Sequence, residues 1–189
     1  MGWCDLNHMM PFPPALRPTS TSALSLAKLV VVEVPTAHVE FFPWTGPPLA
    51  DNYGGKAVLD YHGEPLFAEL VILRHFESAG WNGVWVDTYR RRLRRSMEKA
   101  GVLPSGQRAL LDRVAARAGS RYGCFDVFVW SGQRIAFAEA KRAGADRIRK
   151  NQVLWVAAAL AEGVPLEALL IVEWTLARSS AVPHDGGAV

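Results

Sequence analysis

Three residues of this chain, Asp126, Glu139 and Lys141, have the types and spacing that metal-dependent hydrolysis requires. Asp126 interrupts the apolar, aromatic run 124–130, and Glu139 and Lys141 follow the apolar run 135–138 as a Glu-x-Lys pair. Side chains two residues apart on a strand point to the same face, so Glu139 and Lys141 are expected to project together. If Asp126 shares that face, two carboxylates could hold Mg²⁺ or Mn²⁺, with an ammonium group beside an attacking water.

The apolar surroundings favour this interpretation over a solvated ion pair, which is the ordinary role of neighbouring Glu and Lys. A charge inside a buried segment costs free energy unless it is paired or binds an ion. Lys141 would polarise the water or stabilise the negative charge that develops at a phosphate. The backbone carbonyl of Ala140, between Glu139 and Lys141, is expected to be free to act as a further metal ligand.

Glu69 and Gln152 are two further candidates, each with an alternative role. Glu69 lies beside the apolar stripe of a predicted helix, where it could be a third metal-binding carboxylate or an ordinary boundary residue. Gln152 opens a later helix, where its amide could orient Lys141 or a water by hydrogen bonding, or could lie at the surface.

The elements that must position these residues follow an α/β pattern. A helix is expected to begin near Glu64-Pro65, because proline is tolerated in the first turn, and to stop at Gly80. The elements predicted after it are a strand at 84–88, two helices around 101–106 in a basic insertion, strands at 123–130 and 134–140, a helix at 146–162 and a strand at 169–174. This order predicts a mixed α/β core with helices packed on a central sheet.

The first 60 residues are expected to form an N-terminal extension of this core. Residues 1–22 are rich in Pro, Ser and Thr, which predicts a loose arm. The β-rich segments 28–34 and 38–42 are separated by Pro35 and could form a hairpin.

Basic residues are concentrated on both sides of the candidate site. Residues 90–121 hold ten Arg or Lys and two acidic residues, a net charge of +8 in a chain whose net charge is +3. Clustered arginine is expected where a protein binds a phosphate backbone, although it can also form a solvated helix face. The predicted nucleic-acid-binding residues are Arg90, Arg91, Arg92, Arg94, Arg95, Arg142, Arg147, Arg149 and Lys150.

The composition is that of a globular protein, with 50% hydrophobic and 21% charged residues in a chain of 189. No apolar run approaches the roughly 20 residues of a membrane-spanning helix, and no secretory signal is expected at the N-terminus. Cys4 and Cys124 are too few for a disulfide framework or a zinc quartet. We therefore expect an intracellular, cytoplasmic protein with no membrane partner.

Together these motifs resemble the PD-(D/E)xK nuclease superfamily, and in particular its VRR-NUC branch of virus-type replication and repair nucleases. The similarity covers roughly residues 64–174 and is carried by Ala138-Glu139-Ala140-Lys141-Arg142, Asn151-Gln152-Val153-Leu154-Trp155 and Gly163-Val164-Pro165. It implies a restriction-endonuclease-like αβββαβ core in a domain of residues 61–178, with an Arg-rich insertion at 90–121 and a disordered tail at 179–189.

The resemblance also implies roles for individual residues. Asp126, Glu139 and Lys141 carry over as the catalytic set, Glu69 matches the acidic residue of the family's first helix, and Gln152 matches its helix glutamine. Phe125 stands where the motif name expects proline, a position that varies within the superfamily.

We therefore expect a Mg²⁺- or Mn²⁺-dependent nuclease that hydrolyses DNA, with structured or branched DNA of replication, repair or recombination as the substrate. RNA is an open alternative substrate, and the branch makes a homodimer plausible. The alternative function is a non-catalytic nucleic-acid-binding module of the same fold. A protein that only binds an acidic partner would leave the charges inside two apolar strands unexplained.

Overall fold

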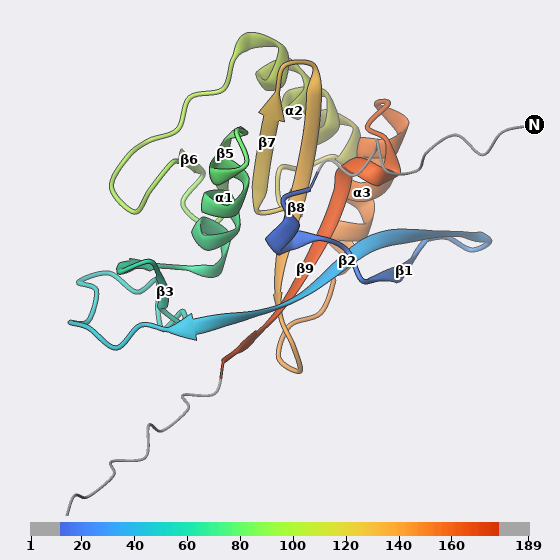
Figure 1. Ribbon diagram of the computed structural model, residues 1–189. Coiled ribbons are helices and arrows are strands. Elements are labelled where there is room, and N and C mark those ends of the chain that lie inside the picture. Colours follow the sequence, from blue (N-terminus) through green and yellow to red (C-terminus); the bar gives the residue numbers. More distant parts are fainter. Residues whose placement is uncertain (1–11, 178–189) are drawn as a thin grey trace, which may run out of the picture.

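Nine strands form one mixed sheet in the computed structural model, which describes residues 12–177 (Figure 1). The elements are η2 (Pro14–Leu16), β1 (Ser20–Ala27), β2 (Val30–Pro43), β3 (Leu59–Tyr61), β4 (Glu64–Leu66), α1 (Ala68–Ser78), β5 (Asn82–Asp87), β6 (Arg92–Arg94), α2 (Ser105–Ala118), β7 (Val127–Ser131), β8 (Arg134–Arg142), α3 (Lys150–Ala161), η3 (Leu166–Ala168) and β9 (Leu169–Leu176). The strand order is β4-β3-β2-β9-β8-β7-β5-β6, with β1 paired to β2. β9 runs parallel to both β2 and β8, and the other neighbouring strands are antiparallel.

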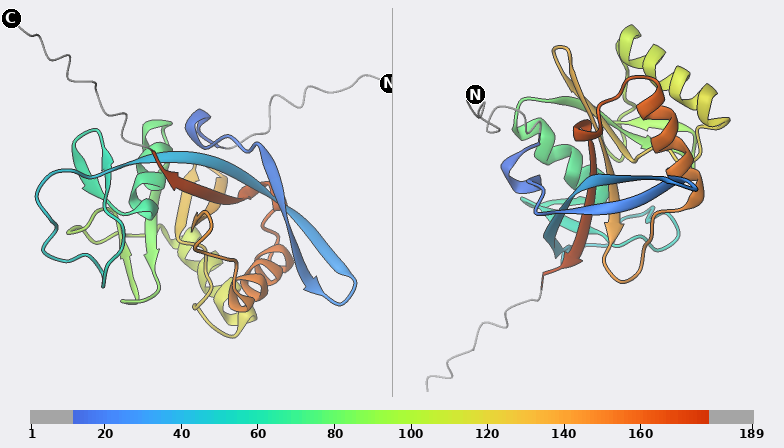
Figure 2. Two further views of the ribbon diagram at one scale, coloured as in Figure 1. Left: turned by 90° about the horizontal axis from the view of Figure 1, so that it is seen from below. Right: turned by 90° about the vertical axis from the view of Figure 1, so that its right-hand side faces the viewer.

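Helices cover both faces of the sheet (Figure 2). Each face has its own apolar core. α1 packs on one face, where Leu70 and Phe76 are fully buried. α2 and α3 lie together on the other face, where Phe137 and Trp155 are fully buried. These layers make a mixed α/β protein, as the order of the predicted elements indicated.

The alternation along β8 decides which face the Glu-x-Lys pair occupies. Ala136 and Ala138 belong to the α1 core, and Phe137 belongs to the α2–α3 core. Because successive strand side chains alternate between faces, Glu139 and Lys141 follow Phe137 onto the α2–α3 side.

The segment before α1 differs from the prediction. Residues 64–66, expected to open the helix, form β4 and pair with β3 in an antiparallel hairpin. His62 and Gly63 have φ values of 52° and 84° at the turn, as a tight two-residue hairpin turn requires. Pro65 therefore lies in a strand, and α1 begins only at Ala68.

The prediction for the N-terminal part was also wrong in two respects. Residues 20–22, predicted to belong to a loose arm, are the first residues of β1; residues 1–11 of that arm lie outside the described residues, as does the tail 179–189. Pro35 does not interrupt the chain's extended course, and the hairpin is formed by β1 with residues 30–36 of β2. The pairing of β2 with β9 begins only at Thr36, so Pro35, which has no N–H, is not required to donate a hydrogen bond to β9.

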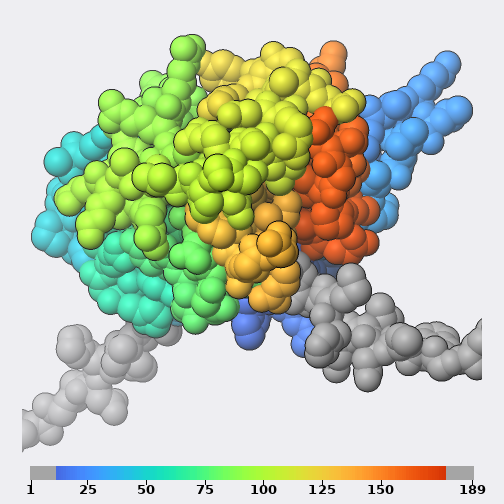
Figure 3. Space-filling view, turned by 90° about the horizontal axis from the view of Figure 1, so that it is seen from above, coloured from blue at the N-terminus to red at the C-terminus, as the bar shows by residue number. Residues whose placement is uncertain are grey.

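The Arg-rich block 90–121 contains one helix rather than the two predicted. Arg91 has a φ of 55° and turns the chain back, so that β6 pairs with β5. α2 alone is helical, and it ends at Gly119 with a φ of 72°. This block, green to yellow in Figure 3, covers much of the face shown there, beside α3 in red-orange.

The other elements predicted from residue 84 onward are present, with ends that shift by a few residues. None of the helices in the described part of the chain is long and apolar enough to cross a membrane.

Candidate active site

Asp126 and Glu139 lie side by side, and each is bonded to the backbone that carries the other. The N–H of Ala140 donates to Oδ2 of Asp126 at 3.1 Å, and the N–H of Asp126 donates to Oε2 of Glu139 at 3.2 Å. Glu139 is buried and Asp126, just before β7, is half-buried. The structure thus brings together the two carboxylates that the strand pattern singled out.

Lys141 and Gln152 converge on the same oxygen of Glu139. Nζ of Lys141 lies 2.7 Å from Oε1 of Glu139, and Nε2 of Gln152 donates to that oxygen as well. Gln152 is itself held, because its Oε1 accepts the N–H of Arg149 at 2.9 Å at the start of α3. Gln152 was expected to orient Lys141 or a water, but its direct partner is the Glu139 carboxylate.

Lys56, which the sequence analysis missed, places a second ammonium group near the site. It lies in the loop between β2 and β3, bonds to Glu69 of α1, and stands 5.7 Å and 5.2 Å from the ring centroids of Phe67 and Trp85. Burial lowers the pKa of Lys56, but the Glu69 carboxylate outweighs it, and the Asp126 charge adds to the net rise. No periodicity marks Lys56, because only the course of an irregular loop brings it to the helix.

Both carboxyl groups of the pair lose protons less readily than free side chains. Burial raises the pKa of Asp126 well above its ordinary value, and the charges of Glu139 and Glu69 raise it further, against the opposing effect of Lys56. Burial also raises the pKa of Glu139, against the opposing charge of Lys141. A bound cation would lower both pKa values, because it favours the charged forms.

The oxygen donors of this pair suit a hard divalent cation. Mg²⁺ is commonly held by one or two carboxylates and keeps several waters. The N–H and C=O of one strand residue point to the same side, so the Ala140 carbonyl faces the Asp126 side with its N–H. Within residues 12–177, no three His, Cys, Asp or Glu side chains are grouped to hold a metal. The available set is therefore Asp126, Glu139 and the Ala140 carbonyl, while Glu69, predicted as a third carboxylate, is bonded to Lys56.

These pKa shifts predict how the metal-free protein responds to pH. The folded state binds protons at Asp126 and Glu139 more tightly than the unfolded state does. The free energy of unfolding is therefore expected to fall as pH rises from about 4, near the unfolded carboxyl pKa, through the raised folded values. Urea unfolding in EDTA, wild type against Asp126→Asn, measures the effect. The wild type should lose stability relative to the variant as pH rises, and a difference that is constant with pH would contradict the assignment.

The predicted nucleic-acid-binding arginines separate into two groups. Arg94 is buried, and its guanidinium bonds to Asp87 and to the Met97 carbonyl, so it holds the fold together instead of lying exposed. Arg90 and Arg95 are paired with Asp51 and Glu77. The remaining predicted residues take part in no ion pair within the described chain, and they are Arg91, Arg92, Arg142, Arg147, Arg149 and Lys150. All six are exposed.

Comparisons with family models, with curated proteins and with solved structures give no match to this chain.

Proposed function

We propose that this protein is a metal-dependent nuclease of the PD-(D/E)xK kind, close to its VRR-NUC branch. One observation carries the proposal: hydrogen bonds and an ion pair join Asp126, Glu139, Lys141 and the Ala140 backbone where β8 passes the start of β7. Three of these groups offer hard oxygen ligands, and the fourth is a cation. Few functions other than phosphate chemistry use such a combination in a partly buried position.

The arrangement of the elements supports the proposal. α1, β5, β7, β8, α3 and β9 follow in the order expected of an αβββαβ core, with β5, β7 and β8 antiparallel and β9 parallel to β8. β6 and α2 lie between β5 and β7, where the basic insertion was predicted.

Each side chain has a task in this proposal. Asp126, Glu139 and the Ala140 carbonyl would hold the divalent cation, which when bound would make a water nucleophilic and neutralise charge at the phosphate. Lys141 would present its ammonium to the negative charge that develops on the phosphate. Gln152, bonded to Glu139, fixes the position of that carboxylate against Lys141.

Charge supports a nucleic acid as the substrate class, and within that class we propose DNA. Arg142 ends β8 directly after Lys141, and Arg147, Arg149 and Lys150 lead into α3, which carries Gln152. These exposed cations border the carboxylate pair along the chain, where a phosphate backbone could lie across them.

Cleavage of labelled DNAs tests the proposal. We expect the full chain to cut at least one of a single strand, a duplex, a flap and a four-way junction in Mg²⁺ or Mn²⁺, and to cut none in EDTA. Glu139→Gln keeps the size of the side chain and removes its charge, so cutting should be lost. Glu167→Gln, at an exposed position of η3, is the matched control and should cut as the wild type does.

A thermal shift provides a second readout that does not depend on turnover. Mn²⁺ or Mg²⁺ should raise the melting temperature of the wild type and of Glu167→Gln but not of Glu139→Gln. If no DNA is cut while DNA is still bound, the assignment as a deoxyribonuclease is wrong, and an RNA substrate or a non-catalytic binding module takes its place.

A further inference from the structure

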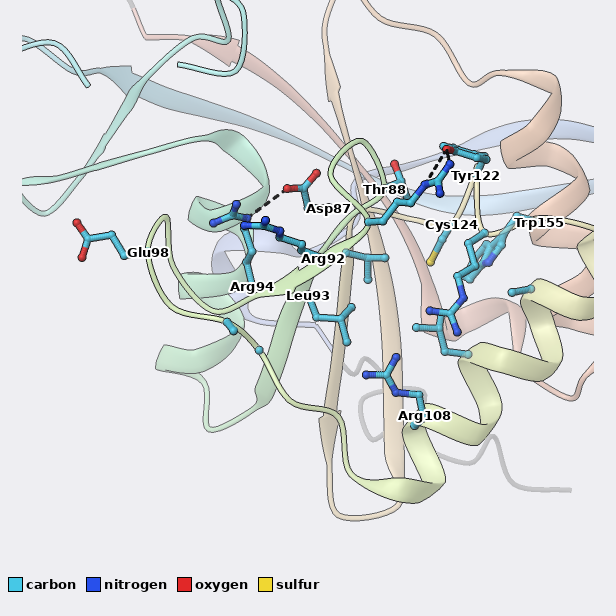
Figure 4. A pocket seen from close by; sticks show the side chains of 17 residues that line it. Asp87, Thr88, Arg92, Leu93, Arg94, Glu98, Arg108, Tyr122, Cys124 and Trp155 are labelled. Carbon is cyan, nitrogen blue, oxygen red and sulfur yellow. Dashed lines mark hydrogen bonds and ion pairs between the residues drawn. The ribbon is translucent and has the colours of Figure 1, made fainter. Parts of the chain in front are cut away.

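A cavity of about 660 Å³ lies on the α2–α3 side of the sheet, and neither Asp126 nor Glu139 lines it. Its walls come from β5, from β6 and the residues next to it, and from α2. Residues 121, 122 and 124 also line it, and Trp155 of α3 lies at one end (Figure 4). This volume falls within the range of about 300–1,000 Å³ that is typical of pockets for small molecules. The proposed role of the carboxylate pair does not use this cavity.

Positive charge dominates the lining of the cavity. Five arginines line it, and they are Arg91, Arg92, Arg94, Arg108 and Arg121. Arg94 and Arg121 are paired with carboxylates, whereas Arg91, Arg92 and Arg108 form no ion pair within the described chain. In Figure 4, Glu98 lies at the far side from Arg108 and Tyr122. Three guanidinium groups therefore have capacity to bind an anion.

The rest of the lining is apolar or aromatic. Leu93, Leu111 and Ala115 line the cavity, and Tyr122 holds Arg91 through a hydrogen bond of 3.0 Å to its hydroxyl. Trp155 is fully buried, and its indole N–H is the only buried side-chain donor or acceptor of the described residues that has no hydrogen-bond partner. A ligand with a planar apolar part would complement the apolar side chains of this lining.

We propose that this cavity binds a nucleotide. Its phosphate would bind to one or more of Arg91, Arg92 and Arg108, since a guanidinium group can bond two phosphate oxygens at once. Its base would lie against the apolar wall formed by Leu93, Leu111 and Ala115. The shared chemistry is a phosphate joined to a planar heterocycle, supplied either by a free mononucleotide or by an unpaired nucleotide of a bound strand.

The cavity adjoins the carboxylate pair. Cys124 lines it, and Asp126 follows two residues later in the chain. An unpaired nucleotide held here would fix the strand next to the reacting phosphate. That role rests on the proposed nuclease function, whereas binding of a free nucleotide does not.

Calorimetric titration of the full chain in EDTA tests the inference without cleavage. The probes are dAMP, inorganic phosphate, deoxyadenosine and a short DNA duplex with or without a single-nucleotide 5′ overhang. We expect dAMP, or the overhang duplex in preference to the blunt one, to bind more tightly than phosphate or deoxyadenosine. Binding by dAMP identifies a free-nucleotide site, and binding by the overhang duplex alone identifies a strand site.

Three variants localise the binding. Arg92→Glu and Arg108→Ala should each weaken nucleotide binding about tenfold or more, the loss of one charge-assisted bond. Ala115→Leu narrows the cavity without changing its charge, and should weaken the binding of dAMP more than the binding of phosphate. Arg113→Ala is the control, because Arg113 lies on the same helix but is exposed and paired with Glu162 outside the cavity. Melting curves confirm folding, and Arg92 is exposed, so its variant is expected to fold.

The inference is overturned if neither dAMP nor the overhang duplex binds, or if binding is unchanged in both arginine variants. It is also overturned if phosphate alone binds as tightly as dAMP, which would leave the apolar wall without a function. Nucleotide binding that persists in a protein unable to cut any DNA would uphold the cavity and refute only the nuclease.

Discussion

Lys141→Met is expected to lower DNA cleavage by roughly 10²–10⁴-fold, the usual contribution of a positioned proton-transfer or charge-stabilising group. The methionine side chain is an unbranched apolar chain that ends at Cε, one atom short of lysine, so it lacks the ammonium. That ammonium lies 2.7 Å from Glu139 at a site where the two side chains are 12% and 2% exposed. In so dry an environment the charge at the phosphate would have no substitute partner in the solvent. Single-turnover cleavage rates with saturating Mg²⁺ measure the effect.

Two controls separate chemistry from folding and binding. Lys99→Met removes an exposed lysine that takes no part in an ion pair of the described residues, and should cut at the wild-type rate. DNA affinity in EDTA should change little in Lys141→Met, because the lysine acts on the reacting phosphate and not on the strand as a whole. A Lys141→Met protein that cuts within threefold of the wild-type rate would remove Lys141 from the mechanism.

Asp87→Ala is expected to lower the free energy of unfolding by about 3–5 kcal/mol, the cost of leaving one charge of a buried ion pair without its partner. Oδ2 of Asp87 accepts Nε of Arg94 at 3.2 Å, and the side chains are 1% and 9% exposed. The same carboxylate accepts the hydroxyl of Tyr53, whose pKa burial and Asp87 raise to about 12, and the N–H of Arg90. One carboxylate therefore joins the 44–58 loop, the turn after β5, and β6.

Urea unfolding compares this variant with one at an exposed pair. Arg117→Ala breaks the pair with Glu162 on the surface of α2, where solvent screens the charges, and should cost far less stability than Asp87→Ala. Asp87→Ala with Arg94→Leu should recover part of the loss, because no charge is then buried alone. A single Asp87→Ala change that costs no more than Arg117→Ala would show that the buried pair does not hold β6 in place.

The sequence was sufficient to predict the central part of the candidate site. Asp126, Glu139 and Lys141 lie in or next to strands, where a period of two residues fixes the direction of each side chain. Gln152 could be proposed but not its partner, because the packing of α3 on β8 determines that contact. The roles of Lys56 and Asp87 could not be predicted, because only loops bring them close to their partners, Glu69 and Arg94. Loops have no sequence periodicity from which their path could be predicted.

The errors in the fold have local causes. Glu64-Pro65 has the composition of a helix start, but the His62-Gly63 turn pairs residues 64–66 with β3, so they form a strand. Pro35 suggested a break, yet it lies where β2 has only one neighbour. In the basic block, helix-forming arginines were outweighed by the pairing of β6 with β5 and by the Asp87–Arg94 contact. In each case a tertiary pairing overrode a local preference.

The position of β9 has a consequence for how the chain is made. β9, the last strand of the described residues, lies between β2 and β8 and runs parallel to both. During synthesis β2 leaves the ribosome long before β9 is available, and the two can be joined only by closing a very long loop, which is slow. Until then β2 and β8 each present an unpaired edge of N–H and C=O groups, which readily pair with other chains. A nascent or truncated chain that lacks β9 is therefore the form of this protein most prone to aggregate and most in need of a chaperone.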